Sequence, residues 1–205
     1  MLDTPVQAEA YIPRAAPRYA VDPRSSEVRL LVYREGPLER FGHNHVIVGS
    51  VAGEIFAGEA PAASGFRLEI AVASFVVDPL RAREEEGADF AAEVSEQARQ
   101  GTRENMLGAQ VLDAARHPVV RIESLGLVGP PWNPTVTARA TLRGASRDLR
   151  FPCAVFERGD ELVVIANFRI EQSAFGIEPF AVLGGGLRVR DAIEVRIRIL
   201  ARRTA

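Results

Sequence analysis

Lysine is absent from this 205-residue chain, and all 25 of its basic side chains are arginine. Without lysine, the chain has no P-loop phosphate-binding lysine, no Schiff-base chemistry and no Ser-x-x-Lys acylation. Acidic side chains nearly balance the arginines, giving a formal net charge of -2 and an isoelectric point near 6.0. This balance argues against nucleic-acid binding and against a polybasic membrane-binding surface.

Cysteine is nearly absent too, because Cys153 is the only one in the sequence. A single cysteine forms no internal disulfide and no cysteine zinc cluster. Cys153 alternates with Leu149, Phe151 and Val155 in a period-two pattern. We therefore predict that it is a small core residue and not a nucleophile.

The sequence also lacks long apolar runs. No stretch reaches the roughly 18 apolar residues that cross a bilayer, so we expect no stable membrane insertion. Residues 1–17 lack the basic start and apolar run of a signal peptide. As written, the chain is expected to be cytoplasmic, with a flexible leader at residues 1–18 and one domain at residues 19–205.

What the sequence has in abundance is period-two alternation of apolar and polar residues. The clearest case is 187–199, where apolar residues alternate with arginine and glutamate, as in a strand with one buried face. Short turns are predicted at residues 144–146 and 158–160, which favours antiparallel, up-and-down order. The eight predicted strands are 28–34, 46–56, 66–77, 119–128, 136–143, 149–156, 162–170 and 187–199.

One insertion interrupts the strands, at about residues 78–116. Helical spacing of apolar residues follows the acidic run at 84–86, which we expect to be a solvated helix face. Thr102 is the predicted cap of a second short helix. Helices inserted once into such a meander are expected to form a lid.

Eight antiparallel strands leave two exposed edges unless the sheet closes on itself. We therefore predict an all-β fold, an eight-stranded antiparallel barrel with a short helical insertion. Aliphatic residues such as Ile193 would face its lumen, which suits a long hydrocarbon better than a polar metabolite. The phenylalanines placed to line the lumen are Phe41, Phe66, Phe75, Phe151 and Phe168.

Four motifs, in consistent order from residue 19 to the C-terminus, resemble the YceI-like family. They are residues 19–23 (Tyr-Ala-Val-Asp-Pro), 111–122 (from Val-Leu-Asp-Ala-Ala-Arg-His-Pro onward), 142–149 (from Leu-Arg-Gly-Ala-Ser onward) and 173–177 (Ser-Ala-Phe-Gly-Ile). The resemblance implies a lipocalin-like barrel that binds polyisoprenoid lipids in bacteria. Many members are exported, so a periplasmic location is the alternative that the family implies.

Two features depart from the common family pattern. Ser25 stands where the family usually has a histidine, so that histidine's role does not transfer to this chain. The Gly-His-Asn-His segment at residues 42–45 resembles a sub-branch of the family.

His43 and His45 are the most specific chemical feature, because side chains at i and i+2 of a strand point the same way. Three interpretations stay open. The two rings are hydrogen-bonded within a loop-to-strand junction, or they bind the polar head of a ligand at the barrel mouth. In the third, His117 joins them in a three-imidazole zinc site with an open position.

Three further polar residues need an explanation. Asp191 interrupts an apolar face, where an unpaired carboxylate is costly, so it is expected in an internal ion pair or at the barrel mouth. Asn105 is expected to cap a helix or to donate at the lumen entrance. Arg103 is expected to be an exposed helix residue or to contact a lipid phosphate.

The sequence therefore predicts a carrier that binds an isoprenoid or another long-chain lipid, and not an enzyme. No cofactor is expected, and no nucleic-acid partner; a homodimer stays open. The alternative is a metal-dependent enzyme or metal-binding protein with zinc on His43, His45 and His117. The predicted ligand-binding residues are His43, His45, Phe75, Arg103, Asn105, Phe168, Asp191 and Ile193.

Overall fold

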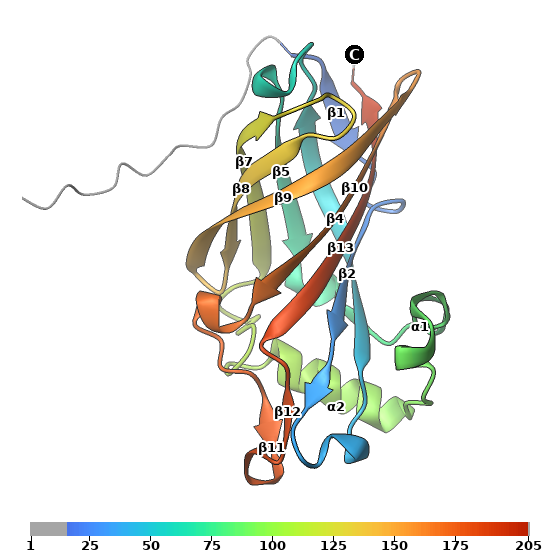
Figure 1. The fold of residues 1–205 in the computed structure, drawn as a ribbon, viewed down its shortest axis with the longest axis vertical. Coiled ribbons are helices and arrows are strands. Elements are labelled where there is room, and N and C mark those ends of the chain that lie inside the picture. Colours follow the sequence, from blue (N-terminus) through green and yellow to red (C-terminus); the bar gives the residue numbers. More distant parts are fainter. Residues whose placement is uncertain (1–15, 205) are drawn as a thin grey trace, which may run out of the picture.

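The computed structural model describes residues 16–204, which form a closed antiparallel barrel with helices at one end (Figure 1). Eight strands each pair with the next one along the chain, and the last pairs with the first to close the barrel. The predicted eight-stranded barrel is therefore confirmed. Its strands are β2 (Glu27–Val32), β4 (His45–Phe56), β5 (Gly65–Ala71), β7 (Val119–Val128), β8 (Thr135–Leu142), β9 (Ala145–Arg158), β10 (Glu161–Glu171) and β13 (Ala192–Arg203).

A short strand, β1 (Arg18–Val21), lies between β13 and β4, beyond the end of β2. Tyr19 pairs with Arg203 of β13 on one side and with Ile55 of β4 on the other. A turn containing Pro23, which has no N–H to donate to a sheet, separates β1 from β2. Of the predicted leader, residues 1–15 lie outside the described residues, whereas Arg18 already belongs to the barrel.

The β8–β9 hairpin turns one residue earlier than predicted. Arg143 and Gly144 both have positive φ, 51° and 76°, as a two-residue turn of the primed type requires. Ala145 already pairs with Leu142 and belongs to β9. The β9–β10 turn lies within the predicted residues 158–160, and Arg158 pairs with Glu161 across it.

Two predicted strands are broken. The predicted strand 66–77 is interrupted by η3 (Val72–Ser74) before β6 (Val76–Val77) pairs with β4. The predicted strand 187–199 breaks at residues 190–191, so β12 (Leu187–Val189) is separate from β13. With β3 (Arg34–Glu35) and β11 (Ala181–Val182), β12 forms a small sheet that extends the lower end of the barrel in Figure 1.

The insertion contains two helices, and α2 lies across the lower end of the barrel in Figure 1. Ser95 caps α2 by accepting a hydrogen bond from the Ala98 N–H at 3.2 Å. The prediction that Thr102 caps this helix was wrong, since Thr102 lies in its middle. The helices are α1 (Leu80–Glu86) and α2 (Glu96–Leu107), and the remaining 3-10 turns are η1 (Glu39–Phe41), η2 (Pro61–Ala63), η4 (Ala88–Phe90), η5 (Ser173–Phe175) and η6 (Leu183–Gly185).

The acidic run attaches α1 to the barrel wall. Arg29 of β2 contacts Glu85 at 2.6 Å and Glu86 at 3.2 Å, and Arg196 of β13 also contacts Glu86. The Glu86 side chain is only 3% exposed. The prediction of a fully solvated acidic face was therefore wrong at Glu86.

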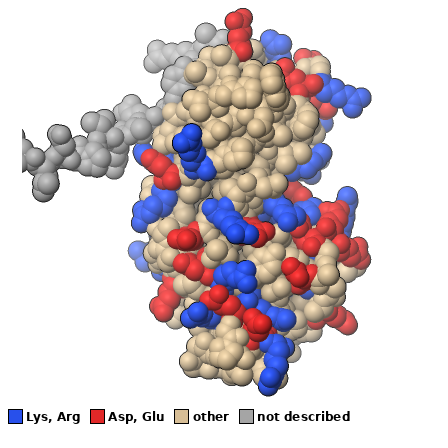
Figure 2. All heavy atoms as spheres, in the orientation of Figure 1, with Lys and Arg blue, Asp and Glu red and all other residues tan. Residues whose placement is uncertain are grey.

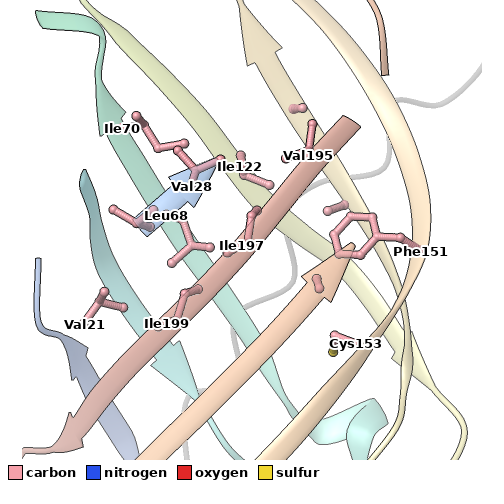
Figure 3. Close-up of a cluster of buried hydrophobic side chains, with 14 of the residues drawn as sticks. Val21, Val28, Leu68, Ile70, Ile122, Phe151, Cys153, Val195, Ile197 and Ile199 are labelled. Carbon is pink, nitrogen blue, oxygen red and sulfur yellow. The ribbon is translucent and has the colours of Figure 1, made fainter. Parts of the chain in front are cut away.

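Inward-facing residues of the strands form the core of the barrel. Figure 3 shows Val28, Ile122, Phe151 and Ile197 among the apolar side chains that converge there from different strands. On the face shown in Figure 2, charged side chains of both signs are intermingled, and no large single-sign patch is present. No helix within residues 16–204 is long and apolar enough to cross a membrane.

Candidate ligand-binding site

Within residues 16–204, the barrel has a cavity toward each end. The lower cavity, of about 280 Å³, lies between the barrel, the small sheet and α2. The upper cavity, of about 110 Å³, lies near the loops that join β4 to β5 and β7 to β8. Apolar side chains dominate both linings, such as Leu30, Ile47 and Ile193 in the lower cavity and Phe66 and Phe151 in the upper one.

Polar groups gather in the lower cavity. His43 and His45 approach it from the start of β4, while Thr102 and Asn105 approach it from α2. Gln172, just after β10, also lines it, as do Arg34 and Arg188. Of the predicted ligand-binding residues, His43, His45, Asn105 and Ile193 therefore line the same cavity.

A layer of packed side chains separates the two cavities. On β13, Ile193 lines the lower cavity and Ile197 lines the upper cavity, while Val195 between them lines neither and is 5% exposed. Phe75 is also buried in the core and lines neither cavity. Phe168 stacks on Phe151 with ring centroids 4.2 Å apart, and it too lines neither of these cavities.

Arg103 and Asp191 line neither cavity. Arg103 donates to the carbonyl oxygens of Phe75 and Ala73, at 3.3 and 3.2 Å, and so ties α2 to the segment before β6. The Asp191 carboxylate accepts the Ser173 N–H at 2.8 Å and also the Ser173 hydroxyl. These hydrogen bonds, chiefly the one from the Ser173 side chain, lower the pKa of Asp191. The internal ion pair predicted for Asp191 was therefore wrong.

Phe41 was expected in the lumen but is 61% exposed, on the 3-10 turn η1 outside the barrel.

Cys153 faces the upper cavity, and burial raises the pKa of its thiol to about 11. A thiol of that pKa is a poor nucleophile at neutral pH. This agrees with the predicted core role of Cys153.

The side chain of His45 is held by Asp78, which forms a buried ion pair with Arg83. Its Nδ1 lies 2.6 Å from Asp78 Oδ2, and Asp78 Oδ1 accepts the Val46 N–H at 2.8 Å and Arg83 Nη1 at 2.6 Å. Arg83 also donates to the carbonyl oxygen of Asn44 at 2.9 Å. The Asp78 side chain is completely buried, so both of its oxygens are hydrogen-bonded where an unpaired carboxylate would be costly.

His43 lies beside this network, with its ring centroid 6.3 Å from that of His45. Burial is the main cause that lowers the pKa of His43, and the nearby charges of Arg34 and Arg83 lower it further. His43 is therefore neutral at physiological pH and presents an uncharged ring to the cavity.

The three histidines do not form one site. His117 lies at the start of β7, where its ring is close to Gly144 in the β8–β9 turn, and it does not line the lower cavity. Within residues 16–204, no group of three or more histidine, cysteine, aspartate or glutamate side chains is placed to hold a metal ion. The three-imidazole alternative therefore has no geometric support.

Sequence reasoning missed the partners of His45. Asp78 and Arg83 are 33 and 38 residues further along the chain, and no local spacing connects them to a histidine on β4. The one local signal is the Asp78-Pro79 pair after two valines, which is typical of a turn that ends a strand. Asp78 has a positive φ of 52°, a conformation that aspartate tolerates better than most residues.

Two solved structures show the same fold at low sequence identity. Burkholderia cenocepacia BcnA is 16% identical, with a TM-score of 0.60 over 88% of this chain and 98% of BcnA. The Campylobacter jejuni YCEI protein is 13% identical, with a TM-score of 0.55 over 76% of this chain and 82% of that protein. No curated protein sequence matches the chain.

A model of the YceI-like domain matches residues 19–201, nearly all of the part that the structure describes. The match spans every strand of the barrel and the helical insertion. The resemblance drawn from the four sequence motifs is thus confirmed, and the chain belongs to the YceI-like family.

Proposed function

We propose that this protein binds an isoprenoid or another long-chain lipid inside the barrel and carries it without altering it. The observation that carries the proposal is the lower cavity, an apolar space whose polar groups gather near α2. A lipid has the same division between a long apolar chain and a small polar end. Membership of the YceI-like family supports the same class of ligand.

Transfer of hydrocarbon from water into the cavity supplies the binding energy, at about 0.8 kcal/mol per buried CH₂ before the costs of ordering the ligand. The polar end of the lipid faces His43, His45 and Asn105, because polar groups that leave water need hydrogen-bond partners. The chain extends toward Ile47 and Ile193.

Farnesol, a short isoprenoid alcohol, provides a test by native mass spectrometry of the lipid-free protein. A charge in the apolar lining opposes the entry of hydrocarbon, so we expect Ile193→Glu to abolish farnesol binding. The matched control is Ile165→Glu on β10, because Ile165 is 38% exposed and lines neither cavity. It should bind farnesol like the wild type.

His43→Ala should leave most of the binding intact, because the apolar chain contributes most of the energy. Circular dichroism establishes that each variant is folded. If folded Ile193→Glu bound farnesol normally while His43→Ala bound none, the lipid would not lie in the lower cavity as proposed.

A further inference from the structure

The hydrogen bonds around Asp78 determine which nitrogen of His45 carries a proton. Burial alone would raise the pKa of the Asp78 carboxyl, but the hydrogen bonds that it accepts, from His45, the Val46 N–H and Arg83, outweigh burial and lower the pKa. At neutral pH, Asp78 is therefore a carboxylate, which only accepts hydrogen bonds. His45 Nδ1, 2.6 Å from Oδ2, must then carry a hydrogen and donate it.

When the ring of His45 is neutral, its other nitrogen is an acceptor. A neutral imidazole carries one N–H, so Nε2 presents a lone pair when Nδ1 is protonated. Arg83 already balances the charge of Asp78. Near Nε2 lies the Thr102 hydroxyl, whose Oγ1 is 3.4 Å away, longer than an ordinary hydrogen bond. Nε2 therefore retains capacity to accept a stronger hydrogen bond from a ligand in the lower cavity.

The arginines that line the lower cavity already have partners. Arg188 forms an ion pair with Glu35 at 2.6 Å, and Arg34 donates to the carbonyl oxygen of Gly42. The neutral ring of His43 adds no positive charge. Arg34 keeps its positive charge, because a carbonyl oxygen does not neutralise it, but a lone pair on His45 Nε2 bonds only to a donor, which a phosphate or carboxylate oxygen is not.

We propose that His45 is neutral in this site, that the lipid ends in a hydroxyl group, which donates its hydrogen bond to His45 Nε2, and that Asp78 selects this end by fixing the imidazole tautomer. The ligand class is thus a long-chain alcohol. Asp78 is a positioning residue, since it acts through His45 and does not line the cavity. The inference rests on the proposed lipid-binding function.

Three probes with the same chain separate the chemistries of the polar end: farnesol, farnesyl methyl ether and farnesyl diphosphate. The alcohol donates a hydrogen bond, the ether only accepts one, and the diphosphate is an anion. We expect the wild-type protein to bind farnesol about tenfold more tightly than the ether, the value of one net hydrogen bond. We expect the diphosphate to bind more weakly than farnesol.

Asp78→Asn should abolish the preference for the alcohol over the ether. Val46 N–H and Arg83 both donate to position 78, so the amide oxygen of asparagine faces them and its NH₂ faces His45 Nδ1. His45 Nε2 then carries the hydrogen and donates it, and both the hydroxyl oxygen and the ether oxygen can accept it. The control is Asp191→Asn, which alters a carboxylate that lines neither cavity and bonds to Ser173, and it should keep the wild-type preference.

His45→Phe is the second variant, because Asp78→Asn changes a buried ion pair and can prevent folding. His45→Phe should bind the alcohol and the ether equally. Equal binding of the two probes by the wild type would overturn the inference, as would tightest binding of the diphosphate, or a preference for alcohol that survives in His45→Phe or in folded Asp78→Asn. If the wild type bound none of the three probes, the proposed lipid-binding function itself would fail.

Discussion

The ring of Phe75 occupies the space in front of Gly49. A Cβ atom at position 49 would lie 2.6 Å from Phe75 Cε1 and 3.2 Å from Val28 Cγ1. Gly49 pairs with Val28 across β4 and β2, one step inward from Leu30 and Ile47 of the lower cavity. Phe75 therefore belongs to the packed layer that divides the barrel interior.

Phe75→Ala should connect the two cavities and allow longer chains to bind. The substitution costs about 3–5 kcal/mol of stability, because it leaves a hole in the core. Native mass spectrometry with isoprenoid alcohols of increasing length should show that the longest bound chain is longer in Phe75→Ala than in the wild type.

The control for this prediction is Phe90→Ala. Phe90 is as deeply buried as Phe75 but belongs to a separate cluster with Leu31 and Val46. Its loss should destabilise the protein without changing the preferred chain length. The same length limit in Phe75→Ala and the wild type would show that Phe75 does not close the lower cavity.

Gly49→Ala should destabilise the protein by about 1–3 kcal/mol, because the new methyl group collides with the Phe75 ring. Replacing Phe75 by Leu in the same chain should recover part of that loss. Urea denaturation measures both effects. Gly126→Ala, where a Cβ would meet nothing within 4 Å, is the control. Additive effects of Gly49→Ala and Phe75→Leu would contradict the contact.

Acid should weaken the contribution of Asp78 to stability. The folded-state pKa of Asp78 is lowered from its ordinary value of 3.8, so its contribution is present above that value and is lost as the pH falls through the folded pKa. The difference in unfolding free energy between the wild type and Asp78→Asn should therefore shrink on acidification. Urea denaturation at neutral pH and at steps below 3.8 measures it, and a constant difference would contradict the account.

Cys153 should resist alkylation in the folded protein. With a pKa of about 11, its thiolate fraction at about pH 8 is on the order of 0.1%. Iodoacetamide should label the native protein far more slowly than the urea-unfolded protein, as followed by mass spectrometry. Equal labelling rates would mean that the thiol is not buried beside the upper cavity.

The barrel was predictable because its strands alternate apolar and polar residues along their length, and a closed sheet is the arrangement that removes exposed edges. The exact ends of elements were less predictable. Ser95 and Thr102 are both good helix caps, and the choice between them depends on where α2 packs. Likewise, a continuous pattern over 187–199 hides the break at Asp191, which the hydrogen bonds to Ser173 stabilise.

The candidate site was predictable only in part. His43 and His45 were singled out from their spacing on one strand, and Asn105 and Ile193 line the lower cavity with them. Their role in binding a ligand stays a prediction. Asp78 and Arg83 were missed because their contacts with His45 depend on the turn after β6 and on the placement of α1. Such contacts between distant segments leave no periodic signal in the sequence.

Native mass spectrometry of the protein purified from its own host, without added ligand, tests the central claim most directly. The account predicts a bound long-chain lipid, released on unfolding and absent from Ile193→Glu but present in Ile165→Glu. A folded wild-type protein that carries no lipid from its host and takes up none when offered would contradict it.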